Sequence, residues 1–207
     1  MEHERKRFFG RYLPTLVLIT VGLVAAGCPD SSPSRTSLEP RSPVSGPPST
    51  SGPDENRYAG TYVYAGTDTE RAAIRTAVDH ATEGMVGKNI ARGELMKRSE
   101  VRPTYTIRFD GKGNVTVETP GYPPESSPLD GTEVQFRTKY GDLVQNKQHF
   151  VDGALLQEGR TSDGGGSTRF ALQPDGKTLV VTRVSHSPKL PGTVAFHLTY
   201  TRQPGTP

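Results

Sequence analysis

Residues 193–202 read TVAFHLTYTR, and this stretch has the clearest strand pattern in the chain. Its large apolar residues alternate with smaller or more polar ones and are Val194, Phe196, Leu198 and Tyr200. Successive side chains of a β-strand point to opposite faces of its sheet, so the alternation predicts one buried face and one wetter face. The stretch is therefore expected to be a half-buried strand that closes the folded part of the chain.

The same period of two recurs in short segments from Asn56 to Arg202, a span of ordinary size for one domain. Turns rich in Asp and Gly separate these segments, for example at 110–114 and 163–167. The pattern predicts a mainly β fold, an antiparallel up-and-down barrel of about eight or nine strands, because closing the sheet removes its exposed edges. A β-sandwich or an open sheet is the alternative.

One or two helices are expected between the first strand, over 58–64, and the strands that follow Pro103. Thr67 and Glu70 have the spacing of a capping box, in which each side chain satisfies the other's backbone amide. Apolar residues then recur at helical spacing and are Ile74, Ala77, Val78, Ala81 and Met85. A shorter second helix is expected over 88–97.

The first 28 residues differ in character from the rest. A basic start is followed by an apolar run from Leu13 to Ala26, and Cys28, the single cysteine of the chain, comes two residues later. The run is too short to cross a bilayer, which takes about 20 residues. Its length and its small-residue end are typical of a signal peptide. An ordinary signal or an uncleaved anchor helix is the alternative.

This segment resembles a bacterial lipoprotein signal, in which the residues before the cysteine form a lipobox. Ala25 stands where that motif often has Leu. The resemblance implies that residues 1–27 are removed as a signal peptide and that Cys28 carries acyl chains such as palmitate. The membrane is then a partner through the acylated Cys28, and the folded domain lies in the bacterial cell envelope, outside the cytoplasm.

Residues 28–55 are predicted to be a disordered tether. Seven Pro and eight Ser occur among residues 29–53, which leaves too few apolar groups for a core. The folded domain is expected over 56–203. Removal of residues 1–27 takes away four basic and two acidic residues, which leaves 21 basic and 20 acidic residues. A nearly neutral chain of this kind argues against nucleic acid as a partner.

The folded domain resembles the lipocalin and fatty-acid-binding class of barrels. The resemblance rests on Gly60-Thr61-Tyr62 near its start, on one helical segment after the first strand, and on a meander that ends in an aromatic strand with Arg202. In lipocalins the first strand carries a Trp that packs under a basic residue from a late strand. Tyr62 stands at that place here, and the chain has no Trp. The resemblance implies that Arg202 or Arg183 lies over the Tyr62 ring as a cation–π contact that closes the barrel.

Two functions remain open at this point. The first is a structural or interaction module that engages another envelope protein through the tether and the outer surface. The second is a lipocalin-like binder of a small apolar ligand, because barrels of this size hold one small ligand or are filled by side chains. The candidate ligand-facing residues are Tyr62, Tyr105, Phe109, Phe136, Phe170 and Phe196.

No motif of catalytic chemistry stands out in the sequence. His80 and Glu83 lie one helical turn apart beside Asp79, but opposite the apolar stripe, and are interpreted as a solvated face. The segment 176–178 resembles the end of a phosphate loop, yet it joins two predicted strands instead of a strand and a helix. No catalytic residue, metal or cofactor is therefore expected, and an enzyme with an unrecognised site is the remaining alternative.

Overall fold

The computed structural model describes residues 55–205. The predicted signal peptide, Cys28 and the tether lie outside these residues. The helices are α1 (Glu55–Tyr58), α2 (Asp68–Ala81) and α3 (Lys88–Arg98). The strands are β1 (Gly60–Tyr64), β2 (Thr104–Phe109), β3 (Asn114–Glu118), β4 (Glu125–Pro128), β5 (Val134–Arg137), β6 (Leu143–Val151), β7 (Ala154–Thr161), β8 (Gly164–Leu172), β9 (Thr178–His186) and β10 (Val194–Arg202).

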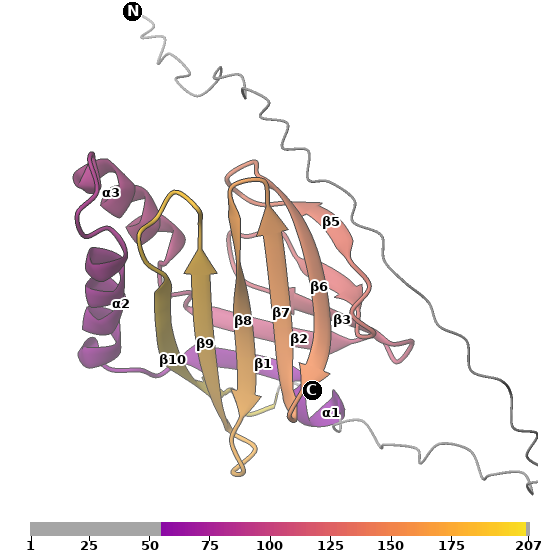
Figure 1. Cartoon of the computed structure of the whole chain (residues 1–207). Coiled ribbons are helices and arrows are strands. Elements are labelled where there is room, and N and C mark those ends of the chain that lie inside the picture. Colours follow the sequence, from indigo (N-terminus) through magenta and orange to yellow (C-terminus); the bar gives the residue numbers. More distant parts are fainter. Residues whose placement is uncertain (1–54, 206–207) are drawn as a thin grey trace, which may run out of the picture. The chain divides into compact units, whose positions relative to one another are not determined.

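The ten strands form one antiparallel sheet in the order β4-β3-β2-β1-β10-β9-β8-β7-β6-β5. This sheet curls into a nearly closed barrel (Figure 1). The prediction of eight or nine strands was too low, because the short β4 lies in a segment rich in Pro that carries no strand pattern. The inward positions of β4 are Glu125 and Ser127, so this strand has no apolar alternation that the sequence could have shown.

The two ends of the sheet approach each other between β4 and β6. Asp130 forms an isolated antiparallel bridge with His149 of β6. The side-chain Nε2 of Gln148 donates a hydrogen bond to the main-chain oxygen of Glu125 at 3.1 Å. One backbone bridge and one side-chain hydrogen bond thus connect the two ends of the sheet, in place of a continuous ladder of backbone hydrogen bonds.

β1 and β10 join the beginning of the domain to its end. Their register places Tyr62 opposite Arg202. The Arg202 guanidinium lies 5.1 Å from the centre of the Tyr62 ring, which is the contact expected there. Its Nη2 also donates to the Tyr62 hydroxyl at 2.5 Å, while burial raises the pKa of that hydroxyl. Arg183 instead lies 5.7 Å from the centre of the Phe196 ring.

α1 covers one end of the barrel (Figure 1). The buried Tyr58 donates from its hydroxyl to the Gly153 oxygen at 2.6 Å and accepts from the Leu172 amide at 3.2 Å. Residues 58–64 were expected to form one strand, but β1 begins only at Gly60. Gly60 has φ of 147°, a conformation that residues with a side chain rarely adopt, so the chain changes direction there.

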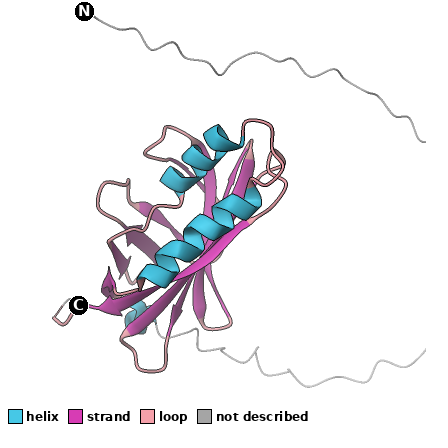
Figure 2. Ribbon diagram, turned by 90° about the vertical axis from the view of Figure 1, so that its left-hand side faces the viewer, coloured by secondary structure: helices cyan, strands magenta, loops and turns pink. Residues whose placement is uncertain are grey.

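α2 and α3 lie between β1 and β2 in the sequence, and Figure 2 shows them on one side of the strands. α2 buries Ile74, Val78 and Ala81 and packs along β10. Met85, which was expected on the same stripe, lies beyond the end of α2. None of the helices among residues 55–205 is long and apolar enough to cross a membrane.

Half of the expected capping box is present. The Glu70 amide donates to the Thr67 hydroxyl at 3.4 Å. The Glu70 carboxylate, however, turns to β10 and accepts hydrogen bonds from the Thr199 amide at 3.0 Å and the Thr199 hydroxyl at 2.7 Å. Glu70 therefore fastens the first turn of α2 to the sheet.

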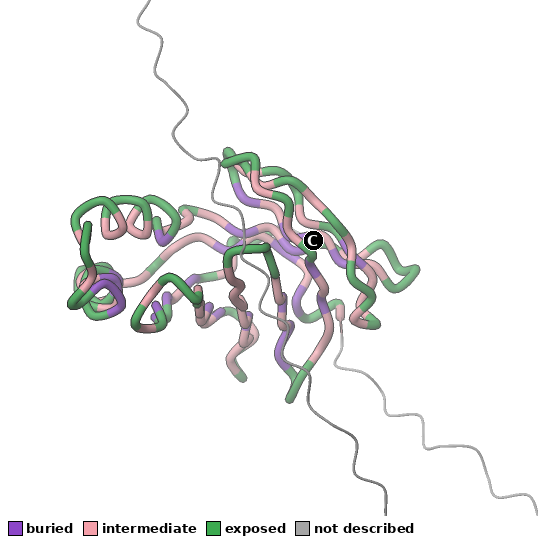
Figure 3. The backbone as a smooth tube through the Cα atoms, turned by 45° about the horizontal axis from the view of Figure 1, so that its top comes forward, coloured by how far each residue is buried: buried purple, intermediate pink, exposed green. Residues whose placement is uncertain are grey.

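The interior near the α1 end is filled by packed side chains. Exposed stretches gather at the turns, and buried stretches run along the strands (Figure 3). Tyr105 makes edge-on ring contacts with Phe170 at 5.2 Å and Tyr200 at 5.1 Å. The largest fully buried apolar side chains here are Tyr62, Ile107, Leu155, Phe170, Leu179, Leu198 and Tyr200. This half of the barrel is a solid core.

Substitution Glu70→Ala is expected to lower the free energy of unfolding by about 1.5–3 kcal/mol, because hydrogen bonds to a charged group contribute about that much. Urea unfolding followed by circular dichroism measures the change. Glu83→Ala is the matched control, since Glu83 is exposed just beyond the same helix. Equal stabilities of the two variants would contradict the role assigned to Glu70.

Candidate functional site

A cavity of about 630 Å³ is lined by residues from the last turn of α3, the β5–β6 turn, the β7–β8 turn and the segment after β9. These elements lie away from α1, whose Tyr58 contacts Gly153 of the β6–β7 turn.

Charged and amide side chains form the inner end of this cavity. We call Arg102, Glu125, Gln157 and Arg183 the inner cluster. Arg102 Nη1 lies 3.9 Å from Glu125 Oε1, and Gln157 Nε2 donates to Glu125 Oε2. The side chains of Arg102 and Glu125 are each only 17% exposed. Arg102 is thus the ion-pair partner of this largely buried carboxylate, and Arg183 acts on it through its charge.

Burial is the dominant influence on this carboxylate. It raises the pKa of Glu125, because the charged form loses hydration. Arg102, Arg183 and the hydrogen bond from Gln157 oppose the effect but do not cancel it. The inner cluster contains two arginines and one carboxylate, so it has an excess of positive charge even when Glu125 is ionised.

Arg102 is held in place by aromatic rings. Its guanidinium lies 4.0 Å from the centre of the Tyr122 ring and 5.9 Å from that of Tyr105. Lys139 Nζ lies 3.7 Å from the Tyr122 centre, a contact that raises the pKa of the lysine. Cation–π contacts of this kind contribute about 0.5–2 kcal/mol each, so they fix Arg102 without neutralising it.

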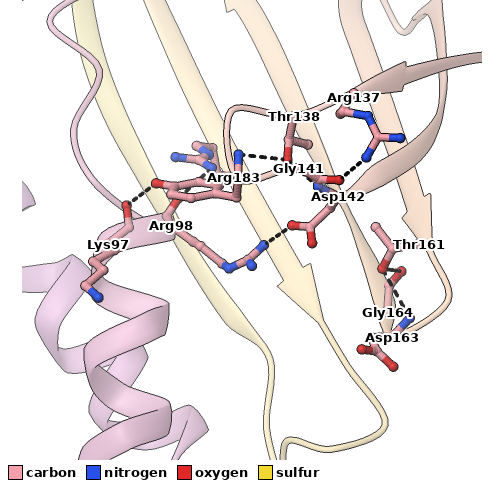
Figure 4. A network of polar contacts seen from close by, with 11 residues as sticks. Lys97, Arg98, Arg137, Thr138, Gly141, Asp142, Thr161, Asp163, Gly164 and Arg183 are labelled. Carbon is pink, nitrogen blue, oxygen red and sulfur yellow. Dashed lines mark hydrogen bonds and ion pairs between the residues drawn. The ribbon is translucent and has the colours of Figure 1, made fainter. Parts of the chain in front are cut away.

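The β5–β6 turn is fastened to the end of α3 at the rim of the cavity (Figure 4). Arg98 Nη1 forms an ion pair with Asp142 Oδ2 at 2.7 Å, and the Tyr140 hydroxyl donates to the Lys97 oxygen at 3.1 Å. Arg183 Nη2 donates to the Arg98 oxygen at 3.2 Å. The rim and the inner cluster therefore belong to one connected network.

Three buried donors beside the cavity have no hydrogen-bond partner within residues 55–205. They are Arg102 Nε, Arg183 Nη1 and Asn146 Nδ2. A buried donor without an acceptor costs about 1–3 kcal/mol. An acceptor that enters the cavity and reaches these groups offsets that cost, so the arrangement favours a ligand rich in acceptor oxygens.

The six aromatic residues predicted to face a ligand do not form the cavity wall together. Tyr105 and Phe136 line the cavity. Tyr62, Phe170 and Phe196 lie in the core, and Phe109 stacks on Phe150 with ring centres 6.3 Å apart. Tyr105, Phe109 and Phe170 pack against other aromatic rings, and Phe196 lies under the Arg183 guanidinium. The expected apolar pocket is therefore replaced by a cavity with a charged inner end.

Most of the inner cluster was missed by the sequence analysis, which considered Arg183 only as a partner of Tyr62. One signal was available in β6, where Asn146 and Gln148 occupy the same face as Val144 and Phe150. Both amide residues are buried, at 1% and 0% exposure. Amide side chains on the inward face of a strand indicate a polar interior.

The acidic and histidine residues of α2 do not assemble a metal site. Asp79 forms an ion pair with Arg92, and His80 and Glu83 are exposed. Within residues 55–205, no three His, Cys, Asp or Glu side chains are grouped in a way that could hold a metal ion.

Comparison with known proteins finds similarity in fold only. No protein-family profile matches the sequence, and no curated protein matches it. Similar solved structures include a fatty acid transporter designated REP1-NXSQ, with 15% identity over 70% of this chain and 95% of that one at a TM-score of 0.44. The fluorescent protein UnaG has 16% identity over 72% and 98%, at a TM-score of 0.48. Lipid binding protein 8 of Caenorhabditis elegans has 11% identity over 72% and 96%, at a TM-score of 0.47. Values at this level assign neither a family nor an activity to the chain.

The raised pKa of Glu125 makes stability depend on pH. The folded protein binds this proton more tightly than the unfolded chain does, so the free energy of unfolding falls as pH rises above the ordinary value of 4.5. Glu125→Gln removes the titration. We expect the stability of the wild type relative to this variant to decrease by up to about 1.4 kcal/mol per pH unit above pH 4.5, until the raised pKa is passed.

Urea unfolding of both proteins between pH 4 and pH 8 measures the difference. Any pH-independent effect of losing the charge cancels in the slope. A difference that stays constant, or that moves in favour of the wild type as pH rises, would contradict the buried environment of Glu125.

Proposed function

We propose that this protein is a non-enzymatic lipoprotein of the bacterial cell envelope whose barrel domain binds a small ligand. The observation that carries the proposal is the cavity of about 630 Å³ with Arg102 and Arg183 at its inner end. Ligand cavities in proteins commonly measure about 300–1,000 Å³. A cavity charged at its inner end holds a molecule in one orientation.

The charges favour a ligand with an anionic group. Glu125 is the single carboxylate of the inner cluster, paired with Arg102 and influenced by the charge of Arg183, and each arginine has a buried donor atom without a partner in the described part of the chain. Arginine binds carboxylates and phosphates through two parallel hydrogen bonds. An anion between the two side chains therefore gains charge-assisted contacts and balances the excess positive charge.

The contacts of Glu125 support binding in preference to catalysis. A general base needs a proton to abstract within hydrogen-bond reach. The oxygens of Glu125 instead face Arg102 and Gln157, which hold a carboxylate but supply no nucleophile. The same contacts suit a group that positions a ligand.

The sequence supports the membrane attachment. Cys28 follows a signal-like segment that resembles a lipobox, and residues 29–53 are rich in Pro and Ser. Two acyl chains anchor a protein firmly, whereas one chain is marginal. The domain is proposed to work at the membrane surface on a tether that, at about 3.1 Å per residue, reaches on the order of 80 Å.

A second candidate function is engagement of another envelope protein. Val86 and Ile90 are almost fully exposed at the junction of α2 and α3, at 102% and 78%. Large exposed apolar residues that lie close together are typical of contact surfaces. This surface lies outside the cavity, so it is compatible with ligand binding.

Ligand binding is tested on the full-length protein purified in a non-ionic detergent. We expect native mass spectrometry and solvent extraction to show one small molecule per chain. Arg183→Met and Arg102→Met are expected to lose it, because each removes a guanidinium from the inner cluster. Arg108→Gln is the matched control, since Arg108 is exposed and pairs with Glu118 on the outside.

An empty cavity in the wild type, together with no thermal stabilisation by any compound of a chemically diverse panel, would overturn the binding function. Equal retention of the molecule by Arg183→Met and Arg108→Gln would overturn the part assigned to the inner cluster.

Membrane attachment is tested by Cys28→Ser in a bacterial host. The wild type is expected in the membrane fraction with incorporated labelled palmitate, and the variant without label. Ser31→Ala is a control that leaves Cys28 intact. Equal labelling of the wild type and Cys28→Ser would show that Cys28 is not the acylated residue.

A further inference from the structure

We infer that the cavity takes a compact, hydroxylated anion, such as an acidic sugar, in preference to a long-chain fatty acid. This inference rests on the proposed binding function and names the chemical class of the ligand. It follows from where the apolar side chains of the barrel are packed and from which residues line the cavity.

The apolar interior leaves no room for an alkyl chain beyond the arginines. Tyr105, Phe170 and Tyr200 fill that region with edge-on ring contacts, and all three are at most 2% exposed. The Tyr200 hydroxyl donates to the Arg102 oxygen at 2.9 Å and fixes the boundary between core and cavity. A ligand must therefore fit between the inner cluster and the rim.

The wall formed by β7, β8 and β9 is made of small and hydroxyl-bearing residues. Its lining includes Gly159, Gly166, Thr168 and Ser185. A Cβ at Gly166 would lie 2.3 Å from the Val184 oxygen, so no larger residue fits there without a shift of the backbone. An alkyl chain against this wall would cover hydroxyl and peptide groups without offering them hydrogen bonds, which is costly. Ligand hydroxyl groups would satisfy them.

Apolar side chains also line the cavity. Phe136 of β5, Val144 of β6 and Leu95 of α3 are among them, and Val144 lies beside Gly159. A sugar ring has hydroxyl groups around its edge and C–H bonds on its faces, so it matches a cavity lined by both polar and apolar groups. A fully polar anion such as sulfate would leave the apolar side chains unused.

The inner cluster then supplies both of the contacts that a hydroxy acid needs. Arg102 and Arg183 bind the acidic group, and Glu125 accepts a hydrogen bond from a neighbouring hydroxyl. Asn146 Nδ2, a buried donor without a partner in the described part of the chain, lies beside them for an additional ligand oxygen. A simple fatty acid has no group that uses Glu125.

The inference is tested by isothermal titration of the full-length protein with matched probes. D-Glucuronate carries a ring with hydroxyls and a carboxylate, D-glucose lacks the carboxylate, and hexanoate has six carbons and a carboxylate but no hydroxyls. D-Glucose 6-phosphate distinguishes a phosphate from a carboxylate, and palmitate represents a long-chain fatty acid. We expect one of the two acidic sugars to bind at least about tenfold more tightly than glucose, hexanoate and palmitate.

Variants separate the two parts of the site. Arg183→Met is expected to weaken the acidic sugar about tenfold or more, and Arg108→Gln to leave it unchanged. Thr168→Val is nearly isosteric and removes one hydroxyl, so it is expected to weaken the acidic sugar but not hexanoate. Circular dichroism confirms that each variant is folded.

The failures are distinguishable. Palmitate or hexanoate binding as tightly as the acidic sugars, or a co-purifying molecule with an alkyl chain and no hydroxyl groups, overturns the inference but leaves a ligand-binding function. No binding of any probe, with no co-purifying molecule, overturns the proposed function itself.

Discussion

Antiparallel pairing of β1 with β10 is the contact on which the rest of the structure depends. It joins the two ends of a meander, and the Tyr62–Arg202 contact lies at one end of the paired residues. The domain has no cysteine and hence no disulfide to hold these ends together. The buried ring and the guanidinium over it supply a local, directional substitute, since a cation–π contact fixes both partners in place. With β1 and β10 paired, the contacts between β4 and β6 close the remaining side of the barrel.

The second junction of the sheet, between β4 and β6, is of a different kind. It uses Gln148 and the bridge between Asp130 and His149 in place of a continuous ladder. Polar side chains on this side face the interior, and the aromatic side chains face it from the strands around β1. The barrel therefore has an apolar end that is packed solid and an end with polar walls that stays open. The candidate site is a consequence of how the sheet closes.

This arrangement relates the proposed function to the fold. Core side chains take up the volume that a long apolar ligand would need, and the remaining cavity offers charge, hydroxyl groups and a few apolar side chains. With the proposed tether and acylated Cys28, such a cavity would hold a small, soluble anion near a membrane. The exposed Val86 and Ile90 lie on a different surface, so docking to a protein and binding of a ligand do not compete for the same residues.

The sequence by itself determined the period-two strands, the turns and the helix stripe of α2, because each depends on local spacing. It left Arg202 and Arg183 as alternative partners of Tyr62, and the structure selects Arg202. Only the tertiary structure decided that β4 is a strand, that Glu70 bonds to Thr199, and that Arg102, Glu125 and Gln157 meet. These three residues lie on separate segments and have no periodic pattern of their own. Their proximity comes from the curl of the sheet, which sums many weak pairings that no local stretch of sequence contains.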